Sequence, residues 1–254
     1  MSADARPTDV VGKALSLLTH LGDFPDGAAA SELARLSGLP LSTAHRLLGM
    51  LVREDYAKFN PSTRRYTLGL RVFQLAQSVA QAHGFSGMAR ATLEQVSLTT
   101  REATLLAVLD ADRLLYVHSI EGPQQVRVVG TPGRHGPLHC TSLGKVLIAY
   151  APANVREHLA HTVRLEVRGP NTITDREQFI DEIANVRSQG YAVADEEHEE
   201  GIRAISVPVF GAGGGVAALS TAAPAYRMSV QHLEELVPTL NEAAKSLAAV
   251  MPLS

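Results

Sequence analysis

Apolar residues recur at helical spacing through the first fifty residues of the chain. Over residues 10–21 they form one wide face, and Gly22 and Pro25 follow as signals that end the helix. A short helix is predicted at 32–37, and a third at 42–53. Residues 56–59 and 64–68 are rich in strand-forming residues and flank a turn cluster, so we predict a hairpin after the third helix.

The spacing between the second and third helices is typical of a helix-turn-helix. Ala34 is small where two helices must approach each other, and Gly38, four residues later, allows a turn with positive φ. Ala44 follows at the position that would pack the third helix against the second. Together with the hairpin, this order predicts a winged helix-turn-helix in residues 1–69, with a small helical domain for protein contacts as the alternative.

The rest of the chain alternates between strand and helix patterns. A linker helix is expected over 69–81, ending before His83, and a further helix over 85–100. Asp175 is expected to cap a helix at 176–189, which Gly190 ends. Additional helices are expected at 143–150, 153–161 and 230–250, and strands at 103–109, 114–120, 126–129, 191–195, 204–210 and 216–221.

These patterns predict an α+β protein with two domains. We expect a DNA-binding domain at 1–69, a linker helix at 70–84, and a C-terminal α/β domain at 85–254 with a mainly antiparallel sheet.

The single cysteine, Cys140, excludes an intramolecular disulfide framework and a structural zinc site built on several thiolates. The N-terminus lacks the apolar run of a signal peptide, and no stretch of 18 apolar residues occurs, so a cytoplasmic protein without membrane contact is expected.

The charge is divided unevenly along the chain. The formal net charge is -3, yet residues 1–85 hold 9 Lys and Arg against 7 Asp and Glu, whereas residues 86–254 hold 14 against 19. The acidic excess therefore lies in the C-terminal part, and the overall charge does not argue against DNA binding by the N-terminal part.

Polar residues at the start of the third helix are the candidates for reading DNA. In a helix-turn-helix the N-terminal residues of the second helix face base edges in the major groove. Arginine can bind guanine through two hydrogen bonds, and a basic wing can contact phosphates or the minor groove. The expected DNA-binding residues are Ser42, Thr43, His45 and Arg46 on the helix and Arg64 and Arg65 on the wing.

Several segments, in order along nearly the whole chain, resemble the isocitrate lyase regulator (IclR) family of bacterial transcription factors. The matching helix-turn-helix and wing segments are ELARLSGLP (32–40), STAHRLL (42–48) and RYTLG (65–69). The matching C-terminal segments are PLHCTSLGK (137–145), TITD (172–175), RSQGY (187–191), EE (196–197) and GIR (201–203). The resemblance implies a GAF-like effector domain, binding to double-stranded operator DNA as a homodimer or dimer of dimers, and control by a small organic effector without a cofactor.

The resemblance also places the effector between the sheet and the segment 137–145. The wall that it implies consists of His139, Cys140, Ser142, Leu143, Ala204 and Ser220. Independently, a helix that begins near Leu143 would offer free backbone N–H groups to an anion.

Three alanines depart from the family pattern. Relatives that bind small oxo-acids often carry Asp, Cys and Ser where this chain has Ala194, Ala204 and Ala222. A pocket without these polar groups should be larger and more apolar, so we expect an effector bigger and less polar than glyoxylate or pyruvate. The alternative is that a neighbour such as Arg127 supplies the missing polarity.

Cys140 and the nearby histidines raise the possibility of functions other than transcription regulation. Cys140 follows His139 directly, but adjacent residues seldom face each other, and the sequence shows no nucleophile elbow or phosphate loop, so no catalytic residue is expected. No metal site is assigned, although His139, Cys140 and His198 could converge on zinc. The competing hypothesis is a small-molecule-binding enzyme or metal sensor that retains an accessory DNA-binding domain.

Overall fold

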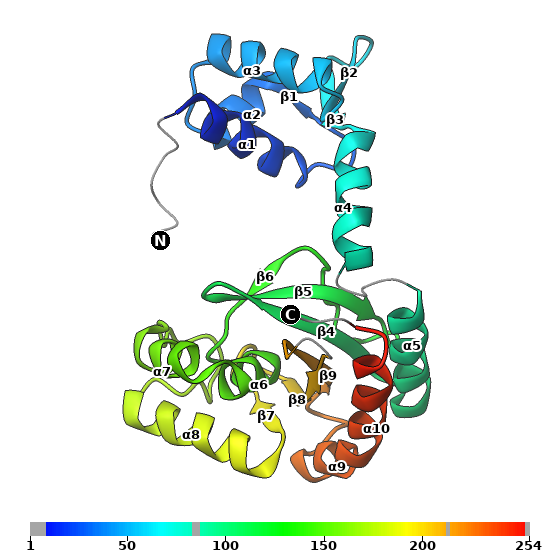
Figure 1. The fold of residues 1–254 in the computed structure, drawn as a ribbon, viewed down its shortest axis with the longest axis vertical. Helices are drawn as coiled ribbons and strands as arrows, with labels where there is room; N and C mark the ends of the chain where they lie inside the picture. The colour runs from blue at the N-terminus through cyan, green and yellow to red at the C-terminus, as the bar shows by residue number, and fades with distance from the viewer. Residues whose placement is uncertain (1–8, 83–86, 212–213, 252–254) are drawn as a thin grey trace. The chain divides into compact units, whose positions relative to one another are not determined.

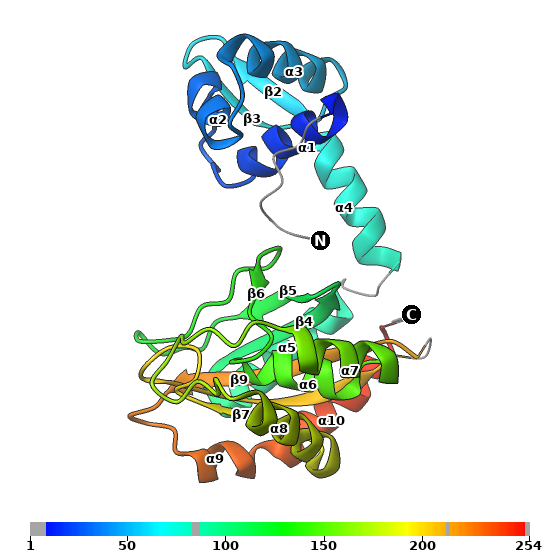
Figure 2. The same cartoon turned by 90° about the vertical axis from the view of Figure 1, so that its left-hand side faces the viewer.

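The structure is a computed structural model that describes residues 9–82, 87–211 and 214–251. It divides into two compact units, Met1–Val79 and Ala80–Ser254, each with its own core. Figures 1 and 2 show the elements of each unit from two directions. Because each unit is built around a separate core, the two are described one after the other.

The N-terminal unit is a three-helix cluster joined to a small antiparallel sheet of order β1-β3-β2. A short strand before the second helix, absent from the sequence prediction, adds an edge to the expected hairpin. The elements are α1 (Val10–Leu21), β1 (Ala28–Ala29), α2 (Ala30–Leu36), α3 (Leu41–Arg53), β2 (Ala57–Asn60) and β3 (Arg65–Leu68).

The turn between α2 and α3 confirms the predicted helix-turn-helix. Ala34 and Ala44 are both buried where the helices meet, at 4% and 0% exposure. Gly38 has φ +63, a left-handed conformation that glycine adopts without strain. Leu17, Leu33 and other apolar residues fill the core below this crossing, so the polar face of α3 is turned outward.

The helix α4 (Leu70–Ala82) follows the wing, as the expected linker helix requires. None of its residues is buried, and Leu70 and Phe73 are 65% and 60% exposed. It includes Gln81, the last residue of the expected helix, whereas the expected start of the next helix at Phe85 lies outside the described residues.

The C-terminal unit is built on a six-stranded sheet of order β6-β5-β4-β9-β8-β7, in which every neighbouring pair is antiparallel. Its strands are β4 (Ala103–Asp110), β5 (Arg113–Ile120), β6 (His135–Gly136), β7 (Ala192–Asp195), β8 (Ile202–Phe210) and β9 (Val216–Pro224). Its helices are α5 (Met88–Thr100), α6 (Ser142–Tyr150), α7 (Ala153–Thr162), α8 (Arg176–Gln189), α9 (Val230–Glu235) and α10 (Val237–Ala248). The predicted antiparallel α+β architecture is confirmed.

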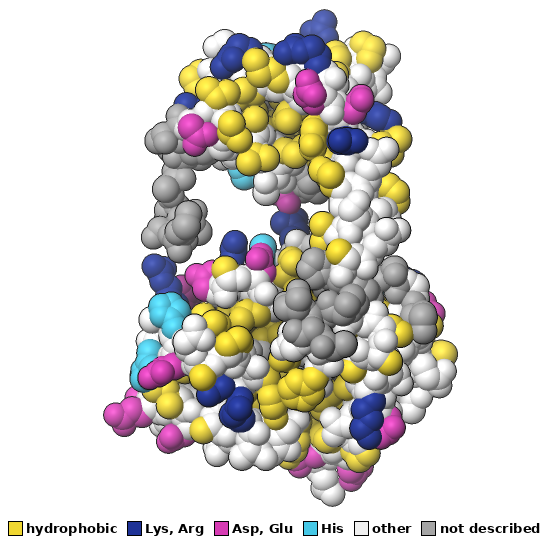
Figure 3. All heavy atoms as spheres, viewed as in Figure 1, with side chains coloured by type: hydrophobic (Ala, Val, Ile, Leu, Met, Phe, Trp, Pro, Cys, Tyr) yellow, Lys and Arg dark blue, Asp and Glu magenta, His cyan; other side chains and the backbone are white. Residues whose placement is uncertain are grey.

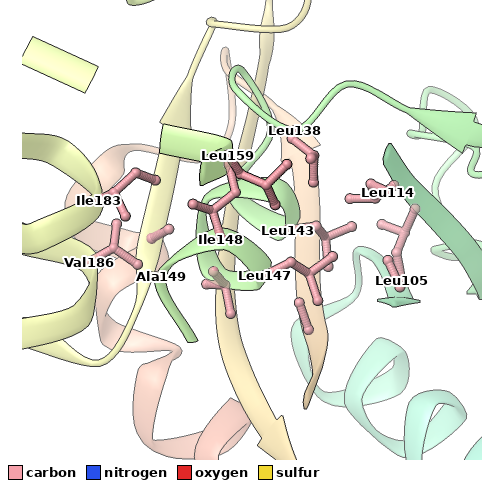
Figure 4. Packing of buried hydrophobic residues seen from close by; sticks show 14 of the residues in the cluster. Leu105, Leu114, Leu138, Leu143, Leu147, Ile148, Ala149, Leu159, Ile183 and Val186 are labelled. Carbon is pink, nitrogen blue, oxygen red and sulfur yellow. The ribbon is translucent and has the colours of Figure 1, made fainter. Parts of the chain in front are cut away.

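The two faces of this sheet are covered by different helices (Figures 1 and 2). Side chains alternate between faces along a strand, so Leu105 packs with α6–α8 while Leu106 packs with α5, α9 and α10. Figure 4 shows α6 between the sheet residue Leu105 and the α8 residues Ile183 and Val186. Residues 142–149 of α6 are all buried, which fixes the start of this helix against the sheet.

Two expected elements are wrong in detail. Residues 126–129 form no strand, since Val126 and Val129 are 61% and 59% exposed and the edge of β5 pairs instead with β6. The helix expected over 230–250 is two helices that meet at Leu236, because Pro238 lacks the backbone N–H that a continuous helix would use.

The predicted caps of α8 are confirmed. Asp175 accepts a hydrogen bond from the backbone N–H of Gln178 at 2.9 Å, and Gly190 ends the helix with φ +90. No helix in the described ranges is both long and apolar enough to cross a membrane.

Candidate nucleic-acid interface and effector cavity

The outward face of α3 presents the side chains expected to read DNA. Ser42, His45 and Arg46 are exposed and Thr43 is half-buried, because Ala44, Leu47 and Leu48 occupy the buried positions of the same helix. No side-chain hydrogen bond or ion pair within the described residues engages these four polar side chains. Figure 3 shows Lys and Arg side chains gathered over α3 along the upper edge of this unit.

The two arginines of the wing have different surroundings. The turn between β2 and β3 is closed by Asn60, whose Oδ1 accepts hydrogen bonds from the backbone N–H groups of Ser62 and Thr63. Arg64 follows this turn with φ +54 and an exposed side chain. Arg65 instead donates a hydrogen bond of 2.5 Å from Nη1 to the carbonyl oxygen of Gly27.

The contact between Arg65 and Gly27 ties the wing to the loop before β1. Gly27 has φ +81, and a Cβ at this position would lie 2.7 Å from the carbonyl oxygen of Tyr66. Close packing and a left-handed backbone therefore both favour glycine there. Arg65 thus holds the wing in place, whereas Arg64 is the arginine with a free guanidinium at its tip.

A small space, here called the inner cavity, lies between α6 and the sheet. Its volume is about 70 Å³. Five of the six residues expected in the effector wall line it, namely Cys140, Ser142, Leu143, Ala204 and Ser220. The remaining lining residues are Leu105, Tyr116, Val128, Thr141, Ala194, His198, Ile202 and Ala222.

His139 does not line the inner cavity. Its side chain is buried, and Nε2–H donates a hydrogen bond of 2.8 Å to the carbonyl oxygen of Glu166. Arg127, weighed as a source of polarity, is ion-paired with Glu121 and lines no part of this cavity. The missing polarity is therefore not restored by either residue.

The three alanines that depart from the family pattern are neighbours on the sheet. Ala194 of β7 pairs with Ala204 of β8, which in turn pairs with Ala222 of β9. Together they form a continuous apolar floor under the inner cavity. The expected loss of polarity is thus concentrated in one row of the sheet.

Three serine hydroxyls lie at one end of this floor. Ser142 Oγ is 2.7 Å from Ser206 Oγ and 3.5 Å from Ser220 Oγ, and Ser220 donates to the carbonyl oxygen of Ile205. Ser206 was missed by the sequence prediction, although it lies two positions after Ala204 and so on the same face of β8. The three hydroxyls are already engaged with one another and with the carbonyl oxygen of Ile205, so other groups are better placed to donate to a ligand.

Those donors are at the start of α6. The helix begins at Ser142, one residue earlier than expected, and its N-cap Thr141 accepts a hydrogen bond from the backbone N–H of Gly144. None of the hydrogen bonds recorded among the described residues uses the backbone N–H groups of Ser142 and Leu143. Free N–H groups at a helix N-terminus favour a carboxylate or another anion.

The cysteine and its histidine neighbours do not form a reactive centre. Cys140 Sγ is 3.6 Å from His198 Nδ1, but burial raises the pKa of the thiol to about 12, so it stays protonated at neutral pH. No group of three or more His, Cys, Asp or Glu side chains within the described ranges is arranged to hold a metal ion. His139 is turned toward Glu166 and does not join Cys140 and His198 as a third ligand.

A larger depression, here called the outer cleft, opens beside the inner cavity and has a volume of about 770 Å³. Tyr116 and His198 line both spaces, so the two spaces adjoin at these side chains. His139 lies on the wall of the outer cleft, together with charged residues of two separate segments, 112–113 and 164–168.

Comparison with known proteins matches both units to one family. Residues 77–249 match the model of the bacterial transcriptional regulator IclR C-terminal domain, and residues 10–61 match the IclR helix-turn-helix domain. The HTH-type transcriptional regulator KdgR of Escherichia coli is 32% identical over 251 residues, which cover 98% of this chain and 95% of that protein.

Solved structures agree with this match over the full chain. The IclR transcriptional regulator from Alicyclobacillus acidocaldarius superposes with a TM-score of 0.81 at 30% identity, covering 94% of this chain and 97% of the other. An IclR homologue from Microbacterium hydrocarbonoxydans, solved in complex with 4-hydroxybenzoate, has a TM-score of 0.81 at 29% identity, covering 93% and 98%.

Proposed function

Because the chain belongs to the IclR family of bacterial transcriptional regulators, and is therefore a ligand-responsive DNA-binding regulator, we propose that α3 reads its operator and that the inner cavity receives its effector. The proposal that α3 reads the operator rests on the exposed and unpaired polar face of this helix. That face is formed by Ser42, Thr43, His45 and Arg46. Arg64 adds a phosphate contact from the wing. Within this proposal, residues 1–69 bind DNA, 70–84 link, and 85–254 sense the effector.

The regulator acts as a homodimer, in keeping with the weak electrostatics of a single DNA-binding unit. Residues 1–85 carry a net charge of only +2, from 9 basic and 7 acidic residues, so one copy gains little from phosphate neutralisation. Apolar side chains are left uncovered on two helices of this unit, Val11 and Leu15 on α1 and Leu70 and Phe73 on α4. Pairing of two copies through these residues would bury them and place two recognition helices on one operator.

The effector is an organic acid with an apolar body. Its carboxylate accepts hydrogen bonds from the free N–H groups of Ser142 and Leu143, and its body lies over the row of Ala194, Ala204 and Ala222. The inner cavity is smaller than the sequence suggests: about 70 Å³ lies well below the ~300–1,000 Å³ of pockets for drug-sized ligands. A larger effector therefore fits only if side chains that line the inner cavity move apart.

Two alternatives lose support. An enzyme based on Cys140 would need a thiolate, which the raised pKa of this thiol opposes. The relatives are named as transcriptional regulators, not as enzymes. A metal sensor would need a third ligand beside Cys140 and His198, and His139 is hydrogen-bonded elsewhere.

A DNA-binding titration tests both halves of the proposal. The full chain is titrated against a labelled fragment from upstream of its own gene, alone and with 4-hydroxybenzoate, glyoxylate or pyruvate added. Sequence-specific binding is expected, with an aromatic acid changing the affinity more than the oxo-acids do. If no sequence-specific binding is found, the proposal that α3 reads the operator is wrong. If a two- or three-carbon oxo-acid binds selectively and tightly, the proposal of an effector with an apolar body is wrong.

A cavity-filling variant separates the two halves. Ala222→Leu places a larger side chain in the inner cavity, at a packing cost of about 1–3 kcal/mol, without touching the N-terminal unit. We expect this variant to bind the DNA fragment as the parent does but to lose the response to the acid. An unchanged response would mean that the effector binds elsewhere.

A further inference from the structure

The outer cleft is built from segments that are distant in the sequence. Asp112 comes from the turn between β4 and β5, and Arg113 is the first residue of β5. His158 comes from α7, and Arg164 and Arg168 come from the segment that follows α7. Its volume of about 770 Å³ falls within the ~300–1,000 Å³ typical of small-molecule sites. In Figure 3, histidine, basic and acidic side chains gather at the edge of the C-terminal unit near α7.

The positive charges of the outer cleft exceed the negative charges that could neutralise them. Arg113, Arg164 and Arg168 line it, against the two carboxylates of Asp112 and Glu166. Arg168 Nη2 is paired with Glu166 Oε2 at 3.2 Å, with both side chains about half exposed. Arg113 and Arg164 are exposed and form no ion pair with any described residue.

His139 contributes hydrogen bonding to the cleft and no charge at neutral pH. Burial lowers the pKa of His139 below its usual value, so this imidazole is neutral at pH 7, and its N–H is already held by Glu166. His135 is paired with Asp110 at 2.7 Å. The fixed positive charge of the cleft therefore rests on the arginines, and it persists at neutral and alkaline pH.

We propose that the outer cleft is a second ligand site, separate from the inner cavity, where Arg113 and Arg164 bind an organic anion with two or more negative charges. A guanidinium presents paired N–H donors that match a carboxylate or a phosphate, and two unpaired guanidinium groups suit a ligand with two such ends. Neither arginine forms an ion pair with a described residue, so binding breaks no existing ion pair. The site does not depend on the inner cavity being the effector site.

Calorimetry of the full chain tests this site with two probes. Citrate represents a polycarboxylate and inorganic phosphate represents a phosphorylated ligand, each titrated at neutral pH with the ionic strength held constant by sodium chloride. Saturable binding of at least one probe is expected. Tighter binding of citrate would assign the site to carboxylates, and tighter binding of phosphate would assign it to phosphorylated compounds. No saturable binding of either probe would overturn the proposal.

Charge variants locate the site. The double variant Arg113→Gln and Arg164→Gln should weaken binding of the better probe by about tenfold or more, equivalent to about 1.4 kcal/mol. Arg90→Gln, on α5 and on the opposite face of the sheet, removes one exposed positive charge that is ion-paired with Glu94, and it should leave binding unchanged. If the double variant and Arg90→Gln lose probe affinity equally, the overall charge of the protein alone attracts the probe. If the double variant binds the probe as the parent does, the probe binds elsewhere. Either result overturns the proposal.

A last control distinguishes this site from the effector cavity. Ala222→Leu fills the inner cavity only, so it should leave probe binding to the outer cleft intact. Circular dichroism checks that this variant is folded. If the folded variant no longer binds the probe, the two spaces form one site and the proposal of a separate second site is refuted. The response of DNA binding to aromatic acids is measured separately, and its failure would leave this result standing.

Discussion

Lys145 Nζ lies 2.6 Å from Glu197 Oε1 in the interior of the C-terminal unit. The lysine side chain is 1% exposed, and Nζ also donates to Glu182 Oε1 at 2.8 Å and to the carbonyl oxygen of Val193 at 3.1 Å. Burial raises the pKa of Glu197, and the neighbouring ammonium opposes that rise. Since Lys145 belongs to α6 and Glu197 precedes His198, this pair joins two walls of the inner cavity.

Removal of one partner should be costly because the other charge is left buried. Lys145→Met is expected to destabilise the C-terminal unit by about 3–5 kcal/mol, measured by urea unfolding. Adding Glu197→Leu should recover much of this loss, because the uncompensated carboxylate is then gone. Lys245→Met, which removes the exposed partner of Glu242, is the matched control and should cost less than ~1 kcal/mol. Equal losses in the two lysine variants would contradict the structural role of the buried pair.

Arg46 is predicted to contact a base. Arg46→Ala should weaken binding to the specific operator by about 1–3 kcal/mol and reduce the sequence preference at one base pair, because arginine pairs with guanine through two hydrogen bonds. Fluorescence anisotropy with operator variants measures both effects. Arg90→Ala, in the C-terminal unit, serves as the control and should bind like the parent. If affinity and preference are both retained in Arg46→Ala, Arg46 does not read the DNA.

The two wing arginines should respond differently to substitution. Asparagine tolerates the positive φ of position 64, so Arg64→Asn removes the charge without straining the backbone. The slope of log affinity against log salt concentration should therefore fall by about one. DNA binding should weaken equally for all sequences, because a phosphate contact does not read bases. Arg65→Met should instead lower stability by about 1 kcal/mol, because the hydrogen bond to Gly27 is lost. A salt slope that changes in Arg65→Met and not in Arg64→Asn would reverse these assignments.

The sequence predicted those features that depend on local spacing. Ala34, Gly38 and Ala44 gave the helix-turn-helix, and Asp175 and Gly190 gave both ends of α8, because caps and helix crossings are set by residues a few positions apart. Pro238 marks the break between α9 and α10 in the sequence as well. The spacing of apolar residues alone predicts one continuous helix there.

Features that depend on distant partners could not be predicted in the same way. Residues 126–129 have a strand-like composition, but the edge of β5 is occupied by β6. Arg65 resembles a free wing arginine until its contact with Gly27, 38 residues away, is known. The resemblance placed His139 in the effector wall, and only the fold shows that its ring is held by Glu166 instead. In each case the contact that decides the structure involves a residue far away in the sequence.

Stability of the C-terminal unit should depend on pH through His139. Burial lowers the pKa of this side chain below the usual value of 6.5, so between the two pKa values the folded protein binds fewer protons than the unfolded chain. The stabilisation is therefore fully present above pH 6.5 and is lost as the pH falls through the folded-state pKa. Denaturant unfolding between about pH 7.5 and pH 5 measures this loss.

Substitution of the buried histidine should flatten that dependence. His139→Gln cannot titrate, so its free energy of unfolding should change less on acidification than that of the parent, even if it is lower at neutral pH. His232→Gln removes an exposed histidine on α9 and should keep the slope of the parent. If His139→Gln and the parent lose stability in parallel as the pH falls, the proton-linked group is another residue, and the burial of His139 does not control the acid sensitivity of this unit.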